Sequence, residues 1–471
     1  MMNKKLVEFI KNFSIVMMGN VYSIFISVIV TFLIPRSFGK EAYSYFQLEN
    51  LYCGYVWIMS LGWNDGLYIK FGGEERKNIN KSQISSQIAA LTCYLSFMGI
   101  CLAFIFGYAA STNEKRFVLW MALTSVIIEI ITISIINIIQ ATNSMKQYAK
   151  IIIFDRSCYM LLVILLLIFR ALDFRYLIFA DIFSKVFTLC LALFEGRDFL
   201  FAEIQDFARI WKDIKELVSI GISISLASYA SRLINNIIQL AIENVWGLLT
   251  FGKVALTLSI SNMFTKFVAA VSAVLFPTLR RTEGQRRVEV YNILNIFLTT
   301  VMLGIFCFYL PVKYILEFLL PGYSESLYYM AILLPISLFE TKVMMLINTY
   351  FKIIRKEREI LYCNVTTVCL SVLLAFVGAY VLRGLTFTVG MIVVLLAFRC
   401  FLEELRLEKY LPIQSNYCIE LLMCIVFIFT SWWIGDIQGT VIYFCIYLIY
   451  LYIQRKNIKD ALLYVRKIAR K

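Results

Sequence analysis

The sequence predicts an all-α polytopic membrane protein with about 14 transmembrane helices. First, 61% of the 471 residues are hydrophobic and only 16% are charged, whereas a soluble domain is about 45–50% apolar and about 25% charged. Second, apolar runs of about 18 or more residues, long enough to cross the bilayer core, recur along the chain. Third, Lys and Arg concentrate in alternate polar segments between these runs, which accounts for the net charge of +14.

The composition also excludes several classes of function. The chain has no His, the commonest general base and metal ligand. None of its 12 Cys forms a CxxC pair, so neither a zinc site nor a redox motif is indicated. The basic residues form no long cluster on a soluble domain, as nucleic-acid binding would require. We therefore expect no enzyme activity, no catalytic or metal site, no cofactor and no nucleic-acid partner.

The expected elements follow in order from the basic N-terminus. The first apolar run is too long for a signal-peptide core, so it is expected to remain as a first span. With the N-terminus in the cytoplasm, the cytoplasmic segments hold about 31 Lys and Arg and the outer loops about 9, which predicts that both termini are cytoplasmic. The expected spans are 14–34, 44–63, 84–109, 117–139, 149–169, 175–194, 217–241, 250–276, 290–310, 328–350, 361–382, 385–402, 417–434 and 438–454.

The segment 199–216 is the longest polar interval before the tail and divides the spans into six, six and two. Apolar residues such as Phe207 and Trp211 recur in it at helical spacing opposite charged ones. Such a helix lies on the membrane surface or packs against the inner loops. The predicted domains are an N-terminal six-helix bundle (1–198), an interfacial linker helix (199–216), a second six-helix bundle (217–410), two additional helices (411–454) and a basic cytoplasmic tail (455–471).

A short pattern occurs twice in the chain. The stretches "IPRSFGKEAYSYF" (34–46) and "IENVWGLLTFGKVA" (242–255) align on Gly39 and Gly247. Each glycine follows an aromatic residue, and each stretch follows an odd-numbered span. Glycine lets the chain turn tightly between two helices. Two halves that both begin in the cytoplasm are parallel repeats, which predicts two six-helix bundles around a central cavity.

The stretch "LIPRSFGKEAYSYFQLENLYCGYVWIMSLGWNDGLYIKFGGEE" (33–75), with its Pro-Arg-x-x-Gly-x-x-x-Tyr hairpin, resembles the N-terminal signature of Wzx-type polysaccharide and O-antigen flippases. "RLINNIIQL" and "LFPTLRR" resemble the seventh and eighth spans of the same family. That family belongs to the multidrug/oligosaccharidyl-lipid/polysaccharide (MOP) superfamily, whose drug antiporters (MATE) share the architecture. The resemblance covers essentially the whole chain in the order and number of spans.

The resemblance implies a transporter of the bacterial plasma (inner) membrane. It would move a polyprenyl-diphosphate-linked oligosaccharide repeat unit from the cytoplasmic to the outer leaflet by alternating access, for lipopolysaccharide, capsule or O-antigen synthesis. It also implies coupling to H⁺ or Na⁺, and a polysaccharide polymerase and glycosyltransferases as partners. The headgroup diphosphate would be held by Arg and Lys, and sugar hydroxyls by amide side chains.

Polar groups within the spans are the candidate site residues, because a charge in the hydrocarbon layer usually faces the protein interior or a water-filled cavity. Arg232 is near the middle of the seventh span, without an acid one turn away, and shares a helix face with three amides. The expected substrate-binding residues are Arg232, Lys266, Asn235, Asn236, Gln239, Lys185 and Lys342. The candidates for ion coupling, or for charge pairs that only hold helices together, are Glu129, Asp155, Arg156, Asp181 and Glu340.

Three alternatives remain open beside the flippase. An ion-coupled drug or metabolite antiporter of the same superfamily would export cations through an acid-dominated cavity, whereas the charges here are mixed. A membrane-embedded glycosyltransferase, polymerase or ligase would need a sizeable outer loop with an acid or His. A non-transporting scaffold would gain nothing from the cost of buried charges.

Overall fold

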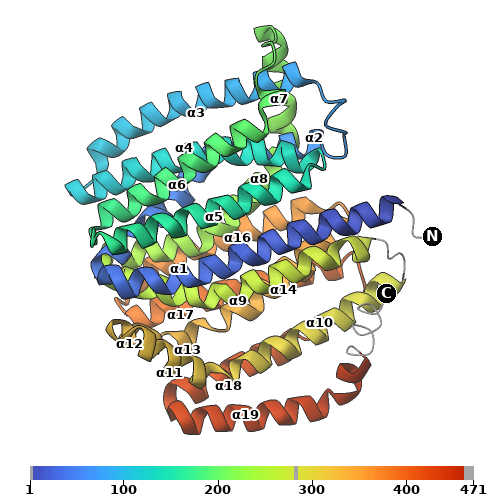
Figure 1. Cartoon of the computed structure of the whole chain (residues 1–471). Helices are drawn as coiled ribbons and strands as arrows, with labels where there is room; N and C mark the ends of the chain where they lie inside the picture. Colours follow the sequence, from blue (N-terminus) through green and yellow to red (C-terminus); the bar gives the residue numbers. More distant parts are fainter. Residues whose placement is uncertain (1–3, 281–284, 461–471) are drawn as a thin grey trace. The chain divides into compact units, whose positions relative to one another are not determined.

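The computed structural model describes residues 4–280 and 285–460, and for residues 4–13, 109, 264, 266–280, 285 and 436 it describes only the backbone. Every regular element in these ranges is helical, and none is a strand (Figure 1). Eleven described helices are long and apolar enough to cross a membrane, and Leu248–Met263 and Ile437–Ile453 are shorter apolar helices. The predicted all-α polytopic fold class is therefore confirmed.

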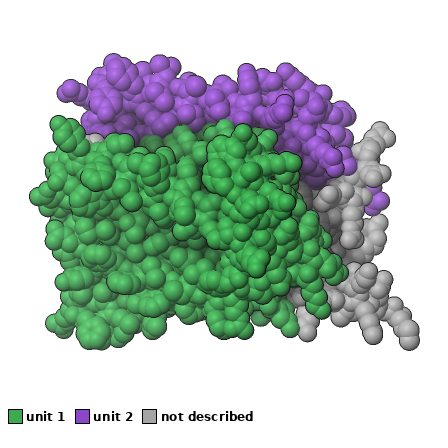
Figure 2. All heavy atoms as spheres, turned by 90° about the horizontal axis from the view of Figure 1, so that it is seen from above, with its two compact units in different colours: residues 1–236 green, residues 237–471 purple. Residues whose placement is uncertain are grey.

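The chain forms two compact units, residues 1–236 (unit 1) and residues 237–471 (unit 2), coloured separately in Figure 2. The helices of unit 1 are α1 (Lys4–Val56), η1 (Trp57–Ser60), α2 (Trp63–Lys70), α3 (Lys81–Ala109), α4 (Asn113–Ala141), α5 (Met145–Ile168), α6 (Phe174–Glu195), α7 (Arg197–Leu200) and α8 (Phe207–Trp246). The last of them, α8, continues past residue 236 into unit 2.

Helix α4 is central to unit 1, where it packs against α1, α2, α3, α5 and α6. Its side chains Ile130, Ile135 and Ile138 are fully buried. Apolar residues occur all round the helix and not along one stripe, as expected for a helix that is buried on several sides. The start of α4 is capped by Thr112, whose hydroxyl accepts a hydrogen bond from the Lys115 amide. Residues from α4 thus face several neighbouring helices at once.

A close backbone approach joins the α2 region to α8 in unit 1. A Cβ atom at Gly66 would lie 2.1 Å from the Leu217 carbonyl oxygen, and one at Gly221 would lie 2.0 Å from that of Gly62. No side chain fits at such distances. Glycine is required there because two backbones are in contact.

Unit 2 begins near the end of α8 and contains the remaining helices. These are α9 (Leu248–Arg280), α10 (Gln285–Phe306), α11 (Tyr309–Leu319), η2 (Pro321–Tyr323), α12 (Ser324–Tyr328), α13 (Met330–Leu333), α14 (Ile336–Lys342), η3 (Val343–Ile347), α15 (Asn348–Ile353), α16 (Glu357–Phe376), η4 (Val377–Val381), α17 (Leu385–Glu408), α18 (Tyr417–Phe429), η5 (Thr430–Ile434) and α19 (Asp436–Ile453).

The central segment of unit 2 is Met330–Ile353. In an apolar stretch of 18 residues within it, 89% of the residues are buried inside the structure. It is not one regular helix. Pro335 separates α13 from α14, and η3 is a π-helical segment that follows Lys342 directly. Helix α14 packs against α9, α10 and α17, so its side chains lie inside the bundle.

Glycines mark the tight turns between spans. The apolar segment Ser14–Ser60 has 47 residues, about 70 Å if straight at about 1.5 Å per residue, more than twice the bilayer core of about 30 Å. Gly39 breaks it with φ 85° and ψ 174°, so α1 consists of two helices. Gly247, with φ 81°, is the single residue between α8 and α9. The paired turns inferred from the sequence are confirmed, and Gly435 (φ 108°) adds a third before α19.

The segment 199–216 consists of the end of one helix, a non-helical stretch and the start of another helix. Helix α7 ends at Leu200, residues 201–206 are not helical, and α8 runs from Phe207 through the following span without a break. The first turns of α3 hold the segment, because Ser85 donates to the Leu200 carbonyl (2.6 Å) and Ser86 accepts from the Gln205 amide (2.8 Å). Of the predicted tail 455–471, residues 461–471 lie outside the described residues.

Candidate functional site

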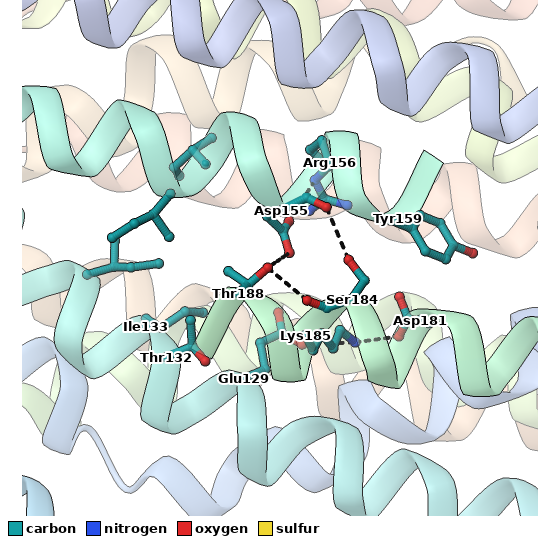
Figure 3. Close-up of a pocket in the computed structure, with 13 residues that line it drawn as sticks. Glu129, Thr132, Ile133, Asp155, Arg156, Tyr159, Asp181, Ser184, Lys185 and Thr188 are labelled. Atoms are coloured by element: carbon teal, nitrogen blue, oxygen red, sulfur yellow. Dashed lines mark hydrogen bonds and ion pairs between the residues drawn. The ribbon is translucent and has the colours of Figure 1, made fainter. Parts of the chain in front are cut away.

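Unit 1 contains a cavity of about 180 Å³ lined by α4, α5 and α6. Figure 3 shows Asp155 and Arg156 on α5 facing a row of polar side chains on α6. The structure brings together five residues that the sequence singled out for substrate binding or ion coupling, from three different spans. The polar or charged lining residues are Glu129, Thr132, Asp155, Arg156, Tyr159, Asp181, Ser184, Lys185 and Thr188.

Lys185 is at the centre of the charges around this cavity. Its Nζ lies 2.8 Å from Asp181 Oδ2, one turn away on α6, and 3.4 Å from Glu129 Oε2 on α4. It also donates a hydrogen bond of 2.6 Å to Ser125 Oγ on α4. The expected Asp181–Lys185 pair is therefore formed, but one lysine serves carboxylates from two helices.

Asp155 joins α5 to α6 on the other side of the cavity. Its carboxylate Oδ1 accepts a hydrogen bond of 3.2 Å from the Thr188 hydroxyl, and its carbonyl accepts one of 3.1 Å from Ser184. The second carboxylate oxygen lies 3.3 Å from Nε of the neighbouring Arg156. The Arg156 side chain is half exposed, which matches a guanidinium that extends toward a more polar layer.

Glu49, on α1, belongs to the same electrostatic cluster, although it was not among the candidates from sequence. It is 1% exposed, and neither carboxyl oxygen has a hydrogen-bond partner of ordinary geometry. Its electrostatic neighbours are Asp181, Lys185, Glu129 and the Ser125 hydroxyl. The available signal was a single acid six residues into the expected span 44–63.

The cluster holds more carboxyl groups than bases. Glu49, Glu129, Asp155 and Asp181 face two bases, Lys185 and Arg156. A buried surplus of negative charge in a low-dielectric layer is costly unless a proton or a cation compensates it. No group of three or more Cys, Asp or Glu suited to a metal ion occurs within the described ranges. The arrangement is therefore suited to binding and releasing a small positive charge.

Arg232 lies elsewhere in unit 1, on α8. Its guanidinium stacks over the Trp57 ring, 4.9 Å from the centroid, and no carboxylate in the described part of the chain pairs with it. The side chain is exposed, whereas Asn235, Asn236 and Gln239 are half-buried on the same helix. A weakly hydrated, stacked guanidinium can bind a phosphate with two hydrogen bonds.

The other two predicted lysines differ in their surroundings. Lys342 is fully buried in unit 2, where Nζ donates to Glu404 Oε2 (2.9 Å) and to both oxygens of Glu420 (2.8 Å each). All three of its hydrogens are thus used within the protein. Lys266 belongs to α9, but its side chain lies outside the described residues. Glu340 pairs with Arg399 in unit 2 at 3.0 Å.

Neither a protein-family model nor a curated relative matches the sequence. Solved structures share the fold. The chain is similar to an inward-facing multidrug resistance MATE family transporter of the MOP superfamily, with 12% identity and a TM-score of 0.62 over 90% of this chain and 99% of that one. The outward-facing form of such a transporter matches with 11% identity and a TM-score of 0.59 over 89% and 97%.

The chain is also similar to the lipid II flippase MurJ in an inward closed conformation. The identity is 12% and the TM-score 0.62, over 95% of this chain and 99% of that one. At these identities the likeness establishes the fold alone, which this chain shares with these transporters.

Proposed function

We propose that this protein is a flippase. It moves a polyprenyl-diphosphate-linked oligosaccharide repeat unit from the cytoplasmic to the outer leaflet of a bacterial plasma membrane, by alternating access, for surface polysaccharide synthesis. The observation that carries the proposal is the extent of the likeness to a lipid II flippase, which covers 95% of this chain. The uncovered share is smaller than the segment 411–454, so the likeness reaches into the two additional helices.

Arg232 is proposed to hold the substrate diphosphate. Its guanidinium is exposed, stacks over Trp57 at 4.9 Å and has no carboxylate partner among the described residues. Arg binds phosphate oxygens in a planar, two-pronged arrangement that a stacked ring helps to orient. The polyprenyl chain is apolar, and it would remain in the bilayer while the headgroup crosses.

The acid-rich cluster of unit 1 is proposed to couple transport to H⁺ or Na⁺. Lys185 compensates at most one of the carboxylates that face it, and Glu49 is buried with both oxygens lacking hydrogen-bond partners. A proton or cation that enters would neutralise the surplus and favour a different pairing of Lys185. This gives the gradient a means of changing contacts between α1, α4 and α6.

The proposal is tested with the full chain in proteoliposomes that contain a defined polyprenyl-diphosphate oligosaccharide. The fraction of headgroup accessible to an external sugar-modifying reagent should rise with time only when protein is present. Arg232→Ala should reduce the rate at least tenfold, and Arg232→Lys should reduce it less. Arg209→Ala, at an exposed arginine near the start of α8, removes the same charge and should leave the rate unchanged. Equal rates in protein-free vesicles would refute the proposal.

The acid surplus of unit 1 favours a second candidate, an ion-coupled drug or metabolite antiporter. Four carboxyl groups against two bases suit a cation better than a diphosphate. The same vesicles, loaded with a cationic dye under a pH gradient, distinguish the two. Dye transport that is lost in Asp181→Asn, together with no movement of the lipid-linked sugar, would establish the antiporter instead.

A further inference from the structure

Unit 2 contains a second cluster of buried charges that is arranged like the one in unit 1. In unit 1, Lys185 on the sixth span contacts Glu129 on the fourth span and Asp181 one turn away on its own helix. In unit 2, Arg399 on the twelfth span contacts Glu340 on the tenth, at 3.0 Å. It also lies 3.8 Å from Glu403, one turn away on α17. The fourth and sixth spans of each half thus hold a base between two acids.

The order of charges along the helix is reversed between the two copies. The acid precedes the base by four residues in α6, whereas the base precedes the acid by four in α17. In both copies the pair occupies one face of the helix, and the base reaches the acid of the same neighbouring span. The repeat that the two glycine turns indicate therefore extends to the charged residues inside the bundles.

Glu403 is a buried carboxyl group of unit 2 that has no hydrogen bond. It is fully buried, and neither of its oxygens has a hydrogen-bond partner. Arg399 donates a hydrogen bond from Nη2 to Glu340 Oε2, and its Nε lies 3.8 Å from Glu403 Oε1. One guanidinium thus faces two acids, and its short contact goes to Glu340. An ionised Glu403 would be a buried charge with only one distant partner, which is strongly unfavourable.

The neighbouring carboxyl pair in the same unit shows the contrast. Glu404 and Glu420 are equally buried, but Lys342 donates to both, Tyr291 donates to Glu404 (3.3 Å) and Thr299 donates to Glu420 (2.8 Å). Every carboxylate oxygen of that pair accepts a hydrogen bond, so both groups are stable as carboxylates. Glu403 lies next to Glu404 in the sequence and has none of these donors.

The remaining groups around Glu403 do not supply a counter-charge. Besides Arg399 and Glu340, the titratable side chains that interact with it are Cys363 on α16 and Cys400 on α17, and neither is a base. Arg406 pairs with Glu359, at 3.5 Å, further along the same two helices. The segments α13 and η3, which also pack on α17, consist of apolar residues. A hard cation needs six or more oxygen ligands, and no metal-binding group of three acids or thiols occurs in the described ranges.

We propose that Glu403 is a proton-binding site of unit 2, the counterpart of the charge cluster in unit 1. In the present conformation the carboxyl group holds its proton, and Arg399 pairs with Glu340. When Arg399 shifts toward Glu403, the O–H bond breaks, the proton leaves to water, and the carboxylate forms the ion pair. Proton binding at Glu403 does not depend on which substrate the protein carries.

Infrared spectroscopy of the full chain in lipid nanodiscs tests this directly, with the proton as the probe. The wild type should show a carboxylic acid C=O band at neutral pH that disappears as the pH rises. Glu49 is also buried without hydrogen-bond partners and can add a band of its own, so one component of the wild-type band should be absent from Glu403→Gln. It should remain in Glu404→Gln, the matched neighbour, and in Glu49→Gln, which removes the buried acid of unit 1. Identical spectra for the wild type and Glu403→Gln at every pH would overturn the proposal.

The stability of the same variants gives an independent answer. Glutamine resembles a protonated glutamate, so Glu403→Gln should fold as well as the wild type at neutral pH and unfold at a higher temperature than the wild type in alkaline buffer. A carboxylate that is ionised in the structure predicts the reverse, with Glu403→Gln less stable at every pH. A failure of Glu403→Gln to fold under conditions where Glu404→Gln folds would therefore also count against the proposal.

Discussion

At the scale of single residues, the charges of unit 1 depend on Lys185. Its ammonium group contacts Asp181, Glu129 and the Ser125 hydroxyl, and its side chain is 20% exposed. Because a lysine has three hydrogens, it can serve these three oxygens at once. Loss of the lysine would leave the carboxyl groups to repel one another and to be desolvated without a donor.

We expect Lys185→Met to lower the free energy of unfolding by about 1–3 kcal/mol, the usual cost of leaving buried polar groups without partners. Lys185→Arg keeps the charge and should cost less. Thermal unfolding of the detergent-solubilised variants measures both. The matched control is Lys150→Met, since Lys150 also pairs with a glutamate but has a 58% exposed side chain. An equal loss of stability at both positions would mean that the buried cluster stabilises the fold no more than an exposed ion pair does.

A second residue-scale prediction concerns pH. Arg76 donates to both carboxylate oxygens of Asp198 and to the Glu195 carbonyl, outside the apolar helices. The hydrogen bonds from Arg76 lower the pKa of Asp198 below its ordinary value. Because the folded pKa is the lower one, the pair stabilises the fold above the unfolded pKa of about 4, and this contribution disappears as the pH falls through the folded pKa.

Asp198→Asn should therefore unfold at a lower temperature than the wild type at neutral pH, and the difference should shrink as the pH is lowered below about 4. Thermal unfolding across this pH range measures it. Glu203→Gln is a suitable control, because Glu203 is an exposed acid five residues after Asp198. A constant difference between wild type and Asp198→Asn at every pH would show that the carboxylate charge is not involved.

At the scale of helices, the turns at Gly39, Gly247 and Gly435 depend on the positive φ that glycine allows. An added Cβ at Gly39 meets no atom within 4 Å, so crowding is not the reason for glycine there. The reason is the backbone, since φ 85° with ψ 174° is a conformation that other residues rarely adopt. The turn therefore excludes side chains through strain within the residue.

Gly39→Ala is expected to destabilise the protein by about 1–3 kcal/mol through this strain alone. Gly390→Ala is the control, because Gly390 lies within α17 and the nearest atom to its added Cβ is 4.0 Å away. Alanine in a helix is favoured over glycine by about 0.5–1 kcal/mol, so the control should be neutral or stabilising. Unfolding temperatures that fall equally in both variants would contradict this account of the turn.

The sequence predicted the spans and the paired glycine turns because both depend on local features. Apolar runs fix helix length, and a glycine after an aromatic residue marks a turn. The partners of individual charges depend on which helices pack together. Lys342 was expected to bind substrate, but Glu420, more than seventy residues later, and Glu404 occupy its hydrogens. Glu49 could not be identified from the sequence, because one acid in an apolar run does not show that its helix faces Lys185.

At the scale of the whole molecule, α18 is joined to the rest of unit 2 by a buried ionic network. Glu420 on α18 contacts Lys342 on α14 and Thr299 on α10, while Glu404 on α17 shares the same lysine. Removal of one partner from a buried ion pair costs about 3–5 kcal/mol. Helix α18 is therefore part of the folded structure of unit 2.

We expect a chain truncated after residue 411 to be expressed poorly or to unfold at a much lower temperature than the full chain. The full-length variant Glu420→Gln is the control. It leaves Lys342 with Glu404 as a neutral pair and keeps the shape of the side chain, so it should lose far less stability. Detergent gel filtration and thermal unfolding measure both. A truncated chain as stable as the full one would show that the network does not hold α18.

The turn at Gly247 affects how deep in the membrane the hairpin of α8 and α9 can lie. Its amide donates to the Glu243 carbonyl (3.0 Å), and its own carbonyl accepts from the Phe251 amide (3.1 Å). The chain thus reverses from one helix into the next while these peptide groups stay hydrogen-bonded within the protein. Hydrocarbon penalises peptide groups that lose water without another partner. These two bonds lower the cost of placing the turn below the lipid headgroups. The last carbonyls of α8 and the first amides of α9 have no partner within their own helices, so they favour a depth at which water or headgroups can reach the hairpin.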